Sequence, residues 1–576
     1  MPFFDWKTKI AQEISTVLNH PEIPAQSLVS EFTSPPQLQM GHLALPCFRL
    51  GKLLGKPAGK LAQELVPHIK NPQVSVSAAG PYLNFRMDPA VLFLTTLSTI
   101  QRQGSRYGSD SSGNKEKVVL EYCSPNIAKR LGFQHIRSTL IGNVLSNVYR
   151  YLGYDAIRIN FIGDWGAQFA RLVAAFELWG QRELLNPNQL QPAMDHLLQI
   201  YVRFHKEADS HPEYLAKASQ CLQRMENGDS DVIELWKKIR EISTIAMNAT
   251  LKRMNVEFDF VEGESHYISL IDKTLEQVKS KTGARISEGA WIVELPGIAT
   301  PALIQKKDGT TLYLTRDIAG AIDRYQRFQF SKHFYIVSEQ QRLHFQQLFG
   351  ILEAMGFDWA NRCAHLSFGT VLFGSEKMST REGRVILLDD LLNEAKALAL
   401  LECTQKNPEL PQKEEVAEMV GVGAIIFSEL STHRTRDMEF DWKTILSFEG
   451  ETAPYVQYSA VRCGSLLAKA AGKGQLTTDI PAPGAYAFSM EEEALILLLS
   501  KFRSTLQSII QDNEPYHLTH YLVDVAKTFN RFYYKHPVLQ ATEPVARDIR
   551  LHLVQATQRV LHNGLNLLGI SCPKEM

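Results

Sequence analysis

The sequence has few cysteines, almost no net charge and no long apolar run. Its seven cysteines are dispersed and none forms a Cys-x-x-Cys pair, so we expect no zinc site and a reducing compartment. The formal net charge is −1, so a polyanion would have to bind a local basic surface. No apolar segment approaches the roughly 20 residues that span a bilayer. The charged N-terminal stretch is not typical of a signal peptide. These absences predict a cytoplasmic protein with no membrane partner.

The chain of 576 residues corresponds to three or four domains of roughly 150 residues each. Residues 1–110 have the pattern of an α+β module, which ends in a polar, Gly/Ser-rich linker at 104–117. Residues 111–390 alternate strand and helix patterns, interrupted by a mostly helical insertion at about 181–285. Residues 391–576 are helical in pattern to the end and predict an all-α bundle.

The stretch 117–166 carries the clearest strand–helix–strand pattern. A β-prone run at 118–122 is followed by apolar residues at helical spacing over 135–153 and by a second strand at 156–161. Strands joined by a crossover helix pair in parallel, and ligands bind beyond their carboxyl ends. The loop 123–135 occupies that place and leads to a helix N-terminus, whose free N–H groups attract phosphate. Taken alone, the pattern also fits an ordinary crossover with a polar loop.

The alternation resumes after the insertion and predicts a split, doubly wound sheet. We expect a hairpin around Pro296-Gly297 and the following further elements: strands at 291–295, 302–304, 312–314, 334–337 and 366–373, a helix through Ile318 and Tyr325, and a helix over 340–356. The helices expected in the C-terminal part lie at about 414–432, 451–470, 490–511, 516–534 and 543–567.

Several short motifs occur in a characteristic order along the chain. They are SPNIAK followed by QHIRST, with a signature region at 125–135, GDWGAQF at 163–169, YLTRDIA at 313–319, KMSTREG at 377–383, FEGETAPYVQYSAVR at 448–462 and the ending LLGISCPKEM. Through these motifs the chain resembles the class I aminoacyl-tRNA synthetases, and among them the arginyl-tRNA synthetases. The signature region resembles the His-x-Gly-His motif of class I, and KMSTREG resembles its Lys-Met-Ser-Lys-Ser loop.

The resemblance implies a fold and an activity. The fold would be a Rossmann-like α/β catalytic domain with an N-terminal α+β module that contacts tRNA and a C-terminal helical bundle that binds the anticodon. The substrates would be ATP with Mg²⁺, L-arginine and the tRNA for arginine. We further expect a monomer. We expect no protein cage for the metal, because Mg²⁺ commonly binds through substrate phosphates.

Adenylate formation requires alignment of the reactants and neutralisation of the departing phosphates. The resemblance assigns catalysis to Lys129, His135, Ser379 and Arg381, and ATP binding to Gly132, Gln134, His135, Lys377, Met378 and Ser379. Each charged residue of this set, considered singly, could also be a solvent-exposed charge in a loop.

The chain departs from the family motifs at three positions. Gly132 stands where the family has its first histidine, Gln134 where it has glycine, and Thr380 where it has the second lysine of the other loop. The usual glycine lets adenine lie flat on the backbone, so Gln134 must turn its side chain away or contact the base. Thr380 lacks the charge of the usual lysine, and the resemblance implies that a lysine just before the first signature compensates. Lys129 occupies that position, so we expect it to carry the larger catalytic role.

A guanidinium group pairs best with a carboxylate beside aromatic surface. By resemblance, the arginine-binding residues are Glu121, Ser124, Asn126, Tyr313, Asp317 and Gln341, with Glu121 the weaker candidate for the α-amino end. Asp317 also fits a plain acid in the first turn of a helix. A site that pairs with the guanidinium would reject lysine and citrulline without an editing domain, because these substrates leave its polar groups unpaired.

The tRNA contacts are expected at Arg434, Arg531 and Tyr534, because basic residues beside aromatics suit unpaired bases. The neighbouring Phe529 and Phe532 also fit a helical core. Two rival hypotheses stay open on sequence alone. One is a class I synthetase for another amino acid. The other is a paralogue that kept the fold to bind tRNA or arginine after its signature changed.

Overall fold

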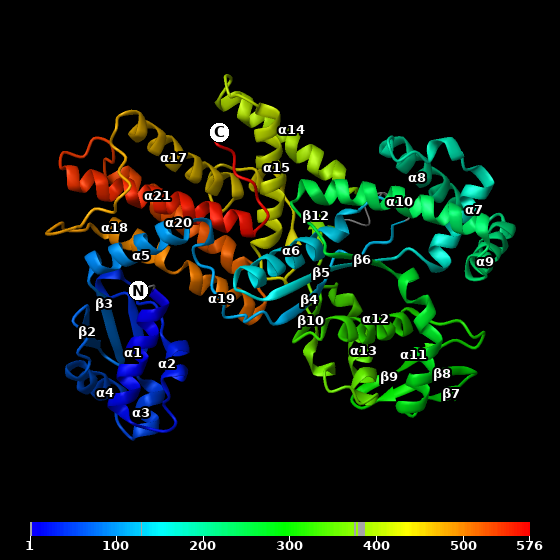
Figure 1. Ribbon diagram of the computed structural model, residues 1–576, viewed down its shortest axis with the longest axis horizontal. Coiled ribbons are helices and arrows are strands. Elements are labelled where there is room, and N and C mark those ends of the chain that lie inside the picture. Colours follow the sequence, from blue (N-terminus) through cyan, green and yellow to red (C-terminus); the bar gives the residue numbers. More distant parts are fainter. Residues whose placement is uncertain (1–2, 128, 374–375, 378–385) are drawn as a thin grey trace.

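The computed structural model describes residues 3–576 except 128, 374–375 and 378–385. Figure 1 shows an N-terminal module beneath one end of a helical bundle, a central sheet, and a group of helices at the opposite end of the molecule. Among the described helices, none combines the length and the apolarity that crossing a bilayer requires.

The N-terminal module packs helices on a three-stranded antiparallel sheet of order β1-β3-β2. In the first helix, Trp6, Ile10 and Ile14 recur every four residues and are buried, which is the spacing of one helix face. The elements are α1 (Phe3–Leu18), α2 (Ala25–Glu31), β1 (Leu43–Pro46), α3 (Phe48–Leu54), α4 (Ala58–Leu65), β2 (Val74–Ala79), β3 (Tyr82–Met87) and α5 (Pro89–Gln103). The linker expected at 104–117 is a loop that starts with a short 3₁₀ turn.

The central sheet is parallel and has the order β11-β10-β4-β5-β6. Its first unit, β4 (Lys117–Glu121), α6 (Ile136–Tyr151) and β5 (Asp155–Ile162), is the strand–helix–strand pattern predicted above. Four of the five β4 residues are buried, as expected for a strand covered on both faces. The remaining strands are β6 (Phe260–Gly263), β10 (Lys332–Tyr335) and β11 (Cys363–His365).

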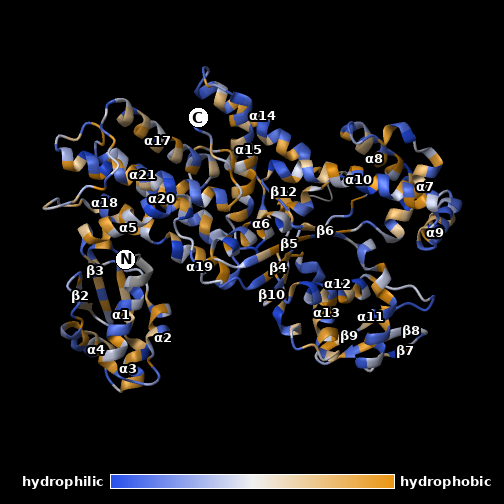
Figure 2. Cartoon of the chain, in the orientation of Figure 1, coloured by the Kyte–Doolittle hydropathy of each residue, from blue (hydrophilic) through white to orange (hydrophobic). Residues whose placement is uncertain are grey.

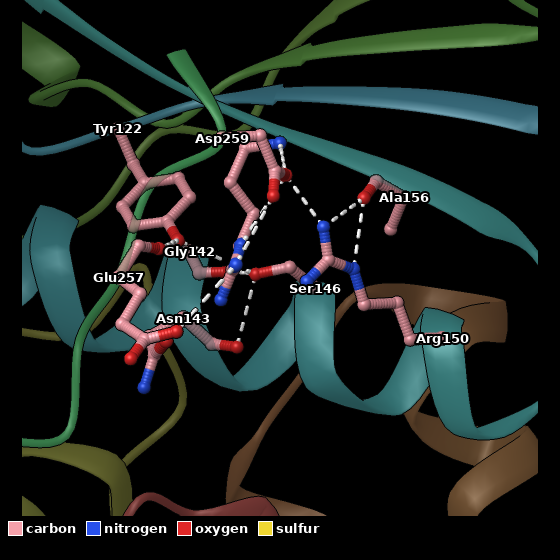
Figure 3. A network of polar contacts seen from close by, with 9 residues as sticks. Tyr122, Gly142, Asn143, Ser146, Arg150, Ala156, Glu257 and Asp259 are labelled. Atoms are coloured by element: carbon pink, nitrogen blue, oxygen red, sulfur yellow. Dashed lines mark hydrogen bonds and ion pairs between the residues drawn. The ribbon is translucent and has the colours of Figure 1, made fainter. Parts of the chain in front are cut away.

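Close contacts anchor α6 to this sheet (Figure 3). A side chain at Gly142 would overlap the ring of Tyr122, with its Cβ only 2.5 Å from Tyr122 Cβ, so helix and strand approach closely because position 142 is glycine. At the other end, Arg150 donates to the carbonyl of Ala156 at 2.7 and 2.9 Å and to Asp259 at 2.5 Å. The start of α6 is thereby fixed relative to the strand ends.

The helical insertion expected at about 181–285 follows α7 (Gly166–Trp179). Its long helices are α8 (Leu190–Glu207), α9 (Pro212–Glu226) and α10 (Ser230–Arg253). Within the range 181–285, however, β6 joins the central sheet beside β5 and is followed by α11 (Ile268–Lys281). Four residues carry too little periodicity to reveal a strand. Asp164 ties the insertion to the sheet, because its Oδ2 accepts from Arg240 at 2.7 Å and from Ser265 at 2.7 Å.

The next segment corrects two strand predictions. The hairpin forms, but within a separate antiparallel sheet of β7 (Arg285–Ser287), β8 (Ala290–Leu295) and β9 (Ile298–Gln305). The strand expected at 312–314 is wrong, because Leu312 is the N-cap of α12 (Tyr313–Phe328). Of the strand expected at 366–373, only its end forms a strand, β12 (Val371–Phe373), because β11 already ends at His365. Helix α13 (Arg342–Ala354) covers β8, and β12 pairs with β13 (Glu376–Lys377) and β14 (Met438–Glu439).

The C-terminal part is helical, with apolar and polar residues interleaved along each helix (Figure 2). It contains α14 (Leu388–Lys406), α15 (Lys413–Leu430), α16 (Trp442–Ile445), α17 (Ala453–Gly472), α18 (Met490–Ser500), α19 (Phe502–Asp512), α20 (Tyr516–Lys535) and α21 (Pro544–Leu567). The helix expected at 490–511 is thus two helices that meet at Lys501. Glu493 of α18 binds His42 at 2.7 Å and Arg86 at 2.6 Å, which joins the bundle to the N-terminal module.

Candidate active site

A cavity of about 550 Å³ lies beyond the carboxyl ends of β4, β5 and β10, where a parallel sheet places its ligands. It collects residues from distant segments, namely Glu121, Ser124, Asn126, Gln134, His135, Tyr313, Asp317 and Gln341. Each of these eight residues was predicted from the sequence to bind ATP or arginine. The parallel sheet brings them together because each follows a strand end or opens a helix beside one.

One end of the cavity is the start of α6. His135 precedes the helix in the 3₁₀ turn η4 (Phe133–His135), and its Nδ1 lies 3.1 Å from the carbonyl oxygen of Gly132. A carbonyl only accepts, so Nδ1 carries the proton. Burial lowers the pKa of His135, the bond to Gly132 opposes this, and the charge of Lys129 lowers the pKa further. The ring is therefore neutral at pH 7, and a bound anion would favour its protonation.

The other end of the cavity is acidic. Glu121, Glu264 and Asp317 line it together. Burial raises the pKa of Glu121 to about 7 and that of Glu264 to about 7, and the charge of Asp317 contributes to both shifts. Glu264 precedes α11 in η6 (Glu264–Tyr267) and accepts from Arg316 Nη1 at 2.8 Å. Glu121 and Glu264 are 5% and 6% exposed, whereas the Asp317 side chain is 19% exposed.

Asp317 and Tyr313 lie one turn apart on α12, so they face the cavity together. Asp317 Oδ2 is 2.5 Å from His344 Nε2 on α13. Burial alone would lower the pKa of His344, but the hydrogen bond with Asp317 and the charges of Asp317 and Glu121 raise it above its ordinary value. One oxygen of Asp317 is thus held by a histidine, and no hydrogen bond to the other oxygen is found among the described residues.

Glu121 has a partner within the protein. Its Oε2 pairs with Arg324, which is 2% exposed and also donates to Glu262 at 3.1 Å. Because removing one member of a buried pair leaves an uncompensated charge, Glu121 is committed to Arg324. Glu121 is therefore already paired within the protein, and its contact with the α-amino group stays a prediction.

The loop after β4 is strained at the cavity. Cys123 and Ser124 have φ angles of 72° and 46°, which place two successive non-glycine residues in the left-handed region. Ser124 Oγ is buried and has no hydrogen-bond partner in the described part of the chain. Asn126 lies against Gly163, where an added Cβ would lie 3.0 Å from Asn126 Cγ and closer still to Oδ1. The glycine of the GDWG motif thus admits the Asn126 side chain.

Two residues expected near the phosphates, Lys129 and Gly132, do not line the cavity of about 550 Å³. Lys129 lines a second cavity of about 440 Å³ beside the insertion, and its Nζ is 4.7 Å from the ring centre of Tyr201. Gly132 is buried and bridges to Leu387. Arg137 is 1% exposed and donates to the carbonyls of Gly369 and Arg436 at 3.3 and 2.9 Å, so it does not reach a ligand.

The second signature loop falls mostly outside the described residues. Met378, Ser379, Thr380 and Arg381 are among the undescribed positions. Lys377 is in β13, and only its backbone is described.

The expected tRNA residues differ in their surroundings. Tyr534 is 91% exposed and Arg531 is exposed beside it on α20. Arg434 is half-buried: its Nη1 donates to the carbonyl of Ser367 at 2.5 Å, and its Nε lies 3.4 Å from Glu514. Arg434 thus has partners within the protein, and its contact with tRNA stays a prediction.

Sequence reasoning missed several cavity residues, above all Glu264 and His344. His344 lies two residues after Arg342 at the start of α13, and Glu264 follows the unrecognised strand β6. An acid directly after a parallel strand would have marked Glu264 if β6 had been found. Nothing local marked His344.

Comparisons with known proteins agree with this geometry. The family model described as tRNA synthetases class I (R), catalytic domain, matches residues 96–442. Two further models, the arginyl tRNA synthetase N-terminal domain and the DALR anticodon binding domain, match residues 5–87 and 456–576. The arginine–tRNA ligase of Halothermothrix orenii is 39% identical over 577 residues, 99% of this chain and 100% of that protein. The chain belongs to the arginyl-tRNA synthetases.

Two further relatives support this family. The arginine–tRNA ligase of Clostridioides difficile is 40% identical and covers 94% of this synthetase and 95% of its own length. The structure of the Thermus thermophilus arginyl-tRNA synthetase matches with a TM-score of 0.80 at 27% identity, over 95% of this chain and 96% of that one. Within the residues described here, no three His, Cys, Asp or Glu side chains converge on a possible metal position.

Proposed function

We propose that this synthetase joins L-arginine to its tRNA in two steps within the cavity of about 550 Å³. In the first step, an arginine carboxylate oxygen bonds to the α-phosphorus of ATP and pyrophosphate leaves. In the second step, a ribose hydroxyl of the terminal adenosine attacks the arginyl carbonyl and AMP leaves. Both steps depend mainly on alignment and charge stabilisation.

The observation that carries this proposal is the opposite character of the two ends of the cavity. Glu121, Glu264 and Asp317 form an acidic end, whereas His135 stands at the N-terminus of α6. A guanidinium suits the first and a polyphosphate suits the second. One cavity therefore orients a cationic amino acid with its carboxylate toward a nucleotide.

The arginine end is assigned residue by residue. Asp317 binds the guanidinium through its free oxygen, and the exposed ring of Tyr313 lies beside it. Gln341, at the end of η7 (Glu339–Gln341), is a further polar contact. Ser124, whose hydroxyl has no partner within the described residues, and Asn126 bind the α-amino end.

The phosphate end is assigned to His135, Gln134 and Lys129. His135 donates from Nε2 once the polyanion has favoured its second proton. Lys129 must leave Tyr201 to reach the phosphates, so we propose that it exchanges between the two cavities. Lys377, Met378, Ser379 and Arg381 stay proposals of family resemblance. Mg²⁺ is proposed to enter with the ATP phosphates, since a magnesium ion keeps several waters and few protein ligands.

The surrounding parts are proposed to serve tRNA. Exposed Arg531 and Tyr534 on α20 suit an unpaired base of the anticodon, and residues 1–110 contact another part of the tRNA. The domain limits 1–110, 111–390 and 391–576 are kept as proposals, as are a monomeric state and a cytoplasmic location.

The decisive experiment measures amino-acid-dependent exchange of pyrophosphate into ATP, with and without tRNA, against a panel of amino acids. We expect exchange with L-arginine and with no other amino acid of the panel. The Asp317→Asn variant should lose this exchange. Exchange with another amino acid would support the rival synthetase. The absence of exchange and of aminoacylation under all conditions would support the paralogue without catalysis.

A further inference from the structure

Two positions in the signature region differ from the resembled motif: one lacks its side chain and the other has gained one. Gly132 stands where the resembled motif has histidine, and Gln134 stands where it has glycine. In the structure, a Cβ added to Gly132 would lie 2.7 Å from Gln134 Nε2 and 2.8 Å from Gln134 Cδ, with Oε1 still closer. The carboxamide of Gln134 therefore occupies the space into which a side chain at 132 would project.

The backbone around Gly132 is fixed. Phe133 N donates to the carbonyl of Ile386 at 2.9 Å, and Leu388 N donates to that of Leu131 at 2.8 Å. The φ and ψ angles of Gly132 are −87° and 160°, which any residue can adopt. Glycine is thus not required at 132 by backbone conformation. A side chain at 132 would instead have to displace the carboxamide of Gln134, which is the end of an exposed, flexible side chain.

Gln134 also lines the cavity beside His135. Gln134 and His135 are adjacent in η4 and both line the cavity of about 550 Å³. Among the residues that the structure describes, the Gln134 carboxamide has no hydrogen-bond partner. Its Nε2 offers two donors, and phosphate oxygens only accept.

We infer that the Gln134 carboxamide, folded into the space beside Gly132, binds the polyphosphate of ATP next to His135, and that Gly132 is needed to leave this space open. This inference rests on the proposed function, since it assumes that ATP occupies the cavity. A histidine at 132 and a glutamine at 134 would then be two ways of placing a donor at one position. The turned side chain of Gln134 also leaves its own backbone uncovered for the adenine.

The test is a double-mutant cycle of Gly132→Ala, Gln134→Ala and the double variant, measured by arginine-dependent ATP–pyrophosphate exchange with tRNA present. A hydrogen bond to a charged group supports an expected loss of about 10- to 100-fold in kcat/KM for ATP in each single variant. The KM for arginine stays unchanged. The double variant loses no more than the worse single variant, because both substitutions remove the same amide from the same place.

A reciprocal exchange completes the test. Gly132→His/Gln134→Gly should recover activity above either of its single variants, because an imidazole then enters the vacated space. Gly472→Ala, at a helix end where nothing lies within 4 Å, is the matched glycine control and should leave exchange unchanged. Melting temperatures without ligand separate misfolding from lost binding, and Gln134→Ala is a surface truncation that does not depend on the tolerance of position 132.

Several outcomes would overturn the inference. One is a silent Gly132→Ala beside an impaired Gln134→Ala, and another is multiplicative losses in the double variant. A change in discrimination between ATP and ITP in Gln134→Ala would assign the amide to the base rather than to phosphate. If the wild-type protein shows no arginine-dependent exchange at all, the proposed function fails instead, which keeps the two failures distinct.

Discussion

The ion pair between Asp317 and His344 predicts that arginine binding depends on pH. The pKa of His344 is raised by Asp317 and Glu121, so below that pKa the ring is protonated and holds Asp317 Oδ2. As pH rises, His344 loses its proton, and one positive charge leaves the place where the guanidinium binds. Glu121 and Glu264, with pKa values of about 7, gain negative charge as pH rises through 7. Arginine should therefore bind more tightly at pH 8 than at pH 6.

The contribution of His344 can be estimated from Coulomb's law. For a guanidinium on the free oxygen of Asp317, we assume a separation from the imidazolium of roughly 5 Å. With an effective dielectric constant of about 20, the repulsion is about 3 kcal/mol. That corresponds to a change of about 100-fold in Kd between the two protonation states of His344. His344→Gln retains an N–H donor for Asp317 but no charge, so its Kd should vary only through the two glutamates.

The assay is calorimetric titration of L-arginine from pH 6 to pH 8.5, repeated in buffers of different ionisation enthalpy. Wild-type protein should release protons on binding, and His344→Gln should release fewer. His211→Gln, which alters a surface ion pair with Glu213 in the insertion, is the control and should match the wild type. An unchanged pH profile in His344→Gln would refute this explanation of the pair.

Three further predictions concern single side chains. Gly163→Ala should lower kcat/KM for arginine at least 10-fold, because its Cβ would lie 3.0 Å from Asn126 Cγ and displace that side chain; steady-state exchange assays measure it. Tyr201→Leu should change kcat and leave the KM for arginine unchanged, because Lys129 loses its aromatic partner at 4.7 Å. An effect confined to arginine affinity would contradict the exchange of Lys129 between the two cavities. Tyr534→Ala should raise the KM for tRNA about 10-fold through lost stacking, with no change in melting temperature because the ring is 91% exposed.

Each of these variants has a neutral counterpart. Gly472→Ala tests the general effect of adding a methyl group to glycine, and Tyr214→Leu on α9 tests the loss of a tyrosine elsewhere in the insertion. Comparable losses in the counterparts would show that the effects are not local to the cavity.

The sequence by itself determined the local elements and the order of the motifs. The unit β4–α6–β5 was predictable because strand and helix periods are read over a few residues, and a crossover helix implies parallel pairing. The same reasoning failed at 312–314, where an apolar triplet is too short to distinguish a strand from the start of α12. It missed β6 for the same reason.

Only the tertiary structure decided which side chains meet. His344 is 27 residues from Asp317, and Glu264 is 53 residues away from it, yet the packing of α12, α13 and η6 gathers them at one end of the cavity. The direction of Lys129 toward Tyr201 also depends on a neighbour from another segment. Periodicity reports which face of an element is buried, whereas the partner of a polar side chain is set by distances between elements that no local pattern contains.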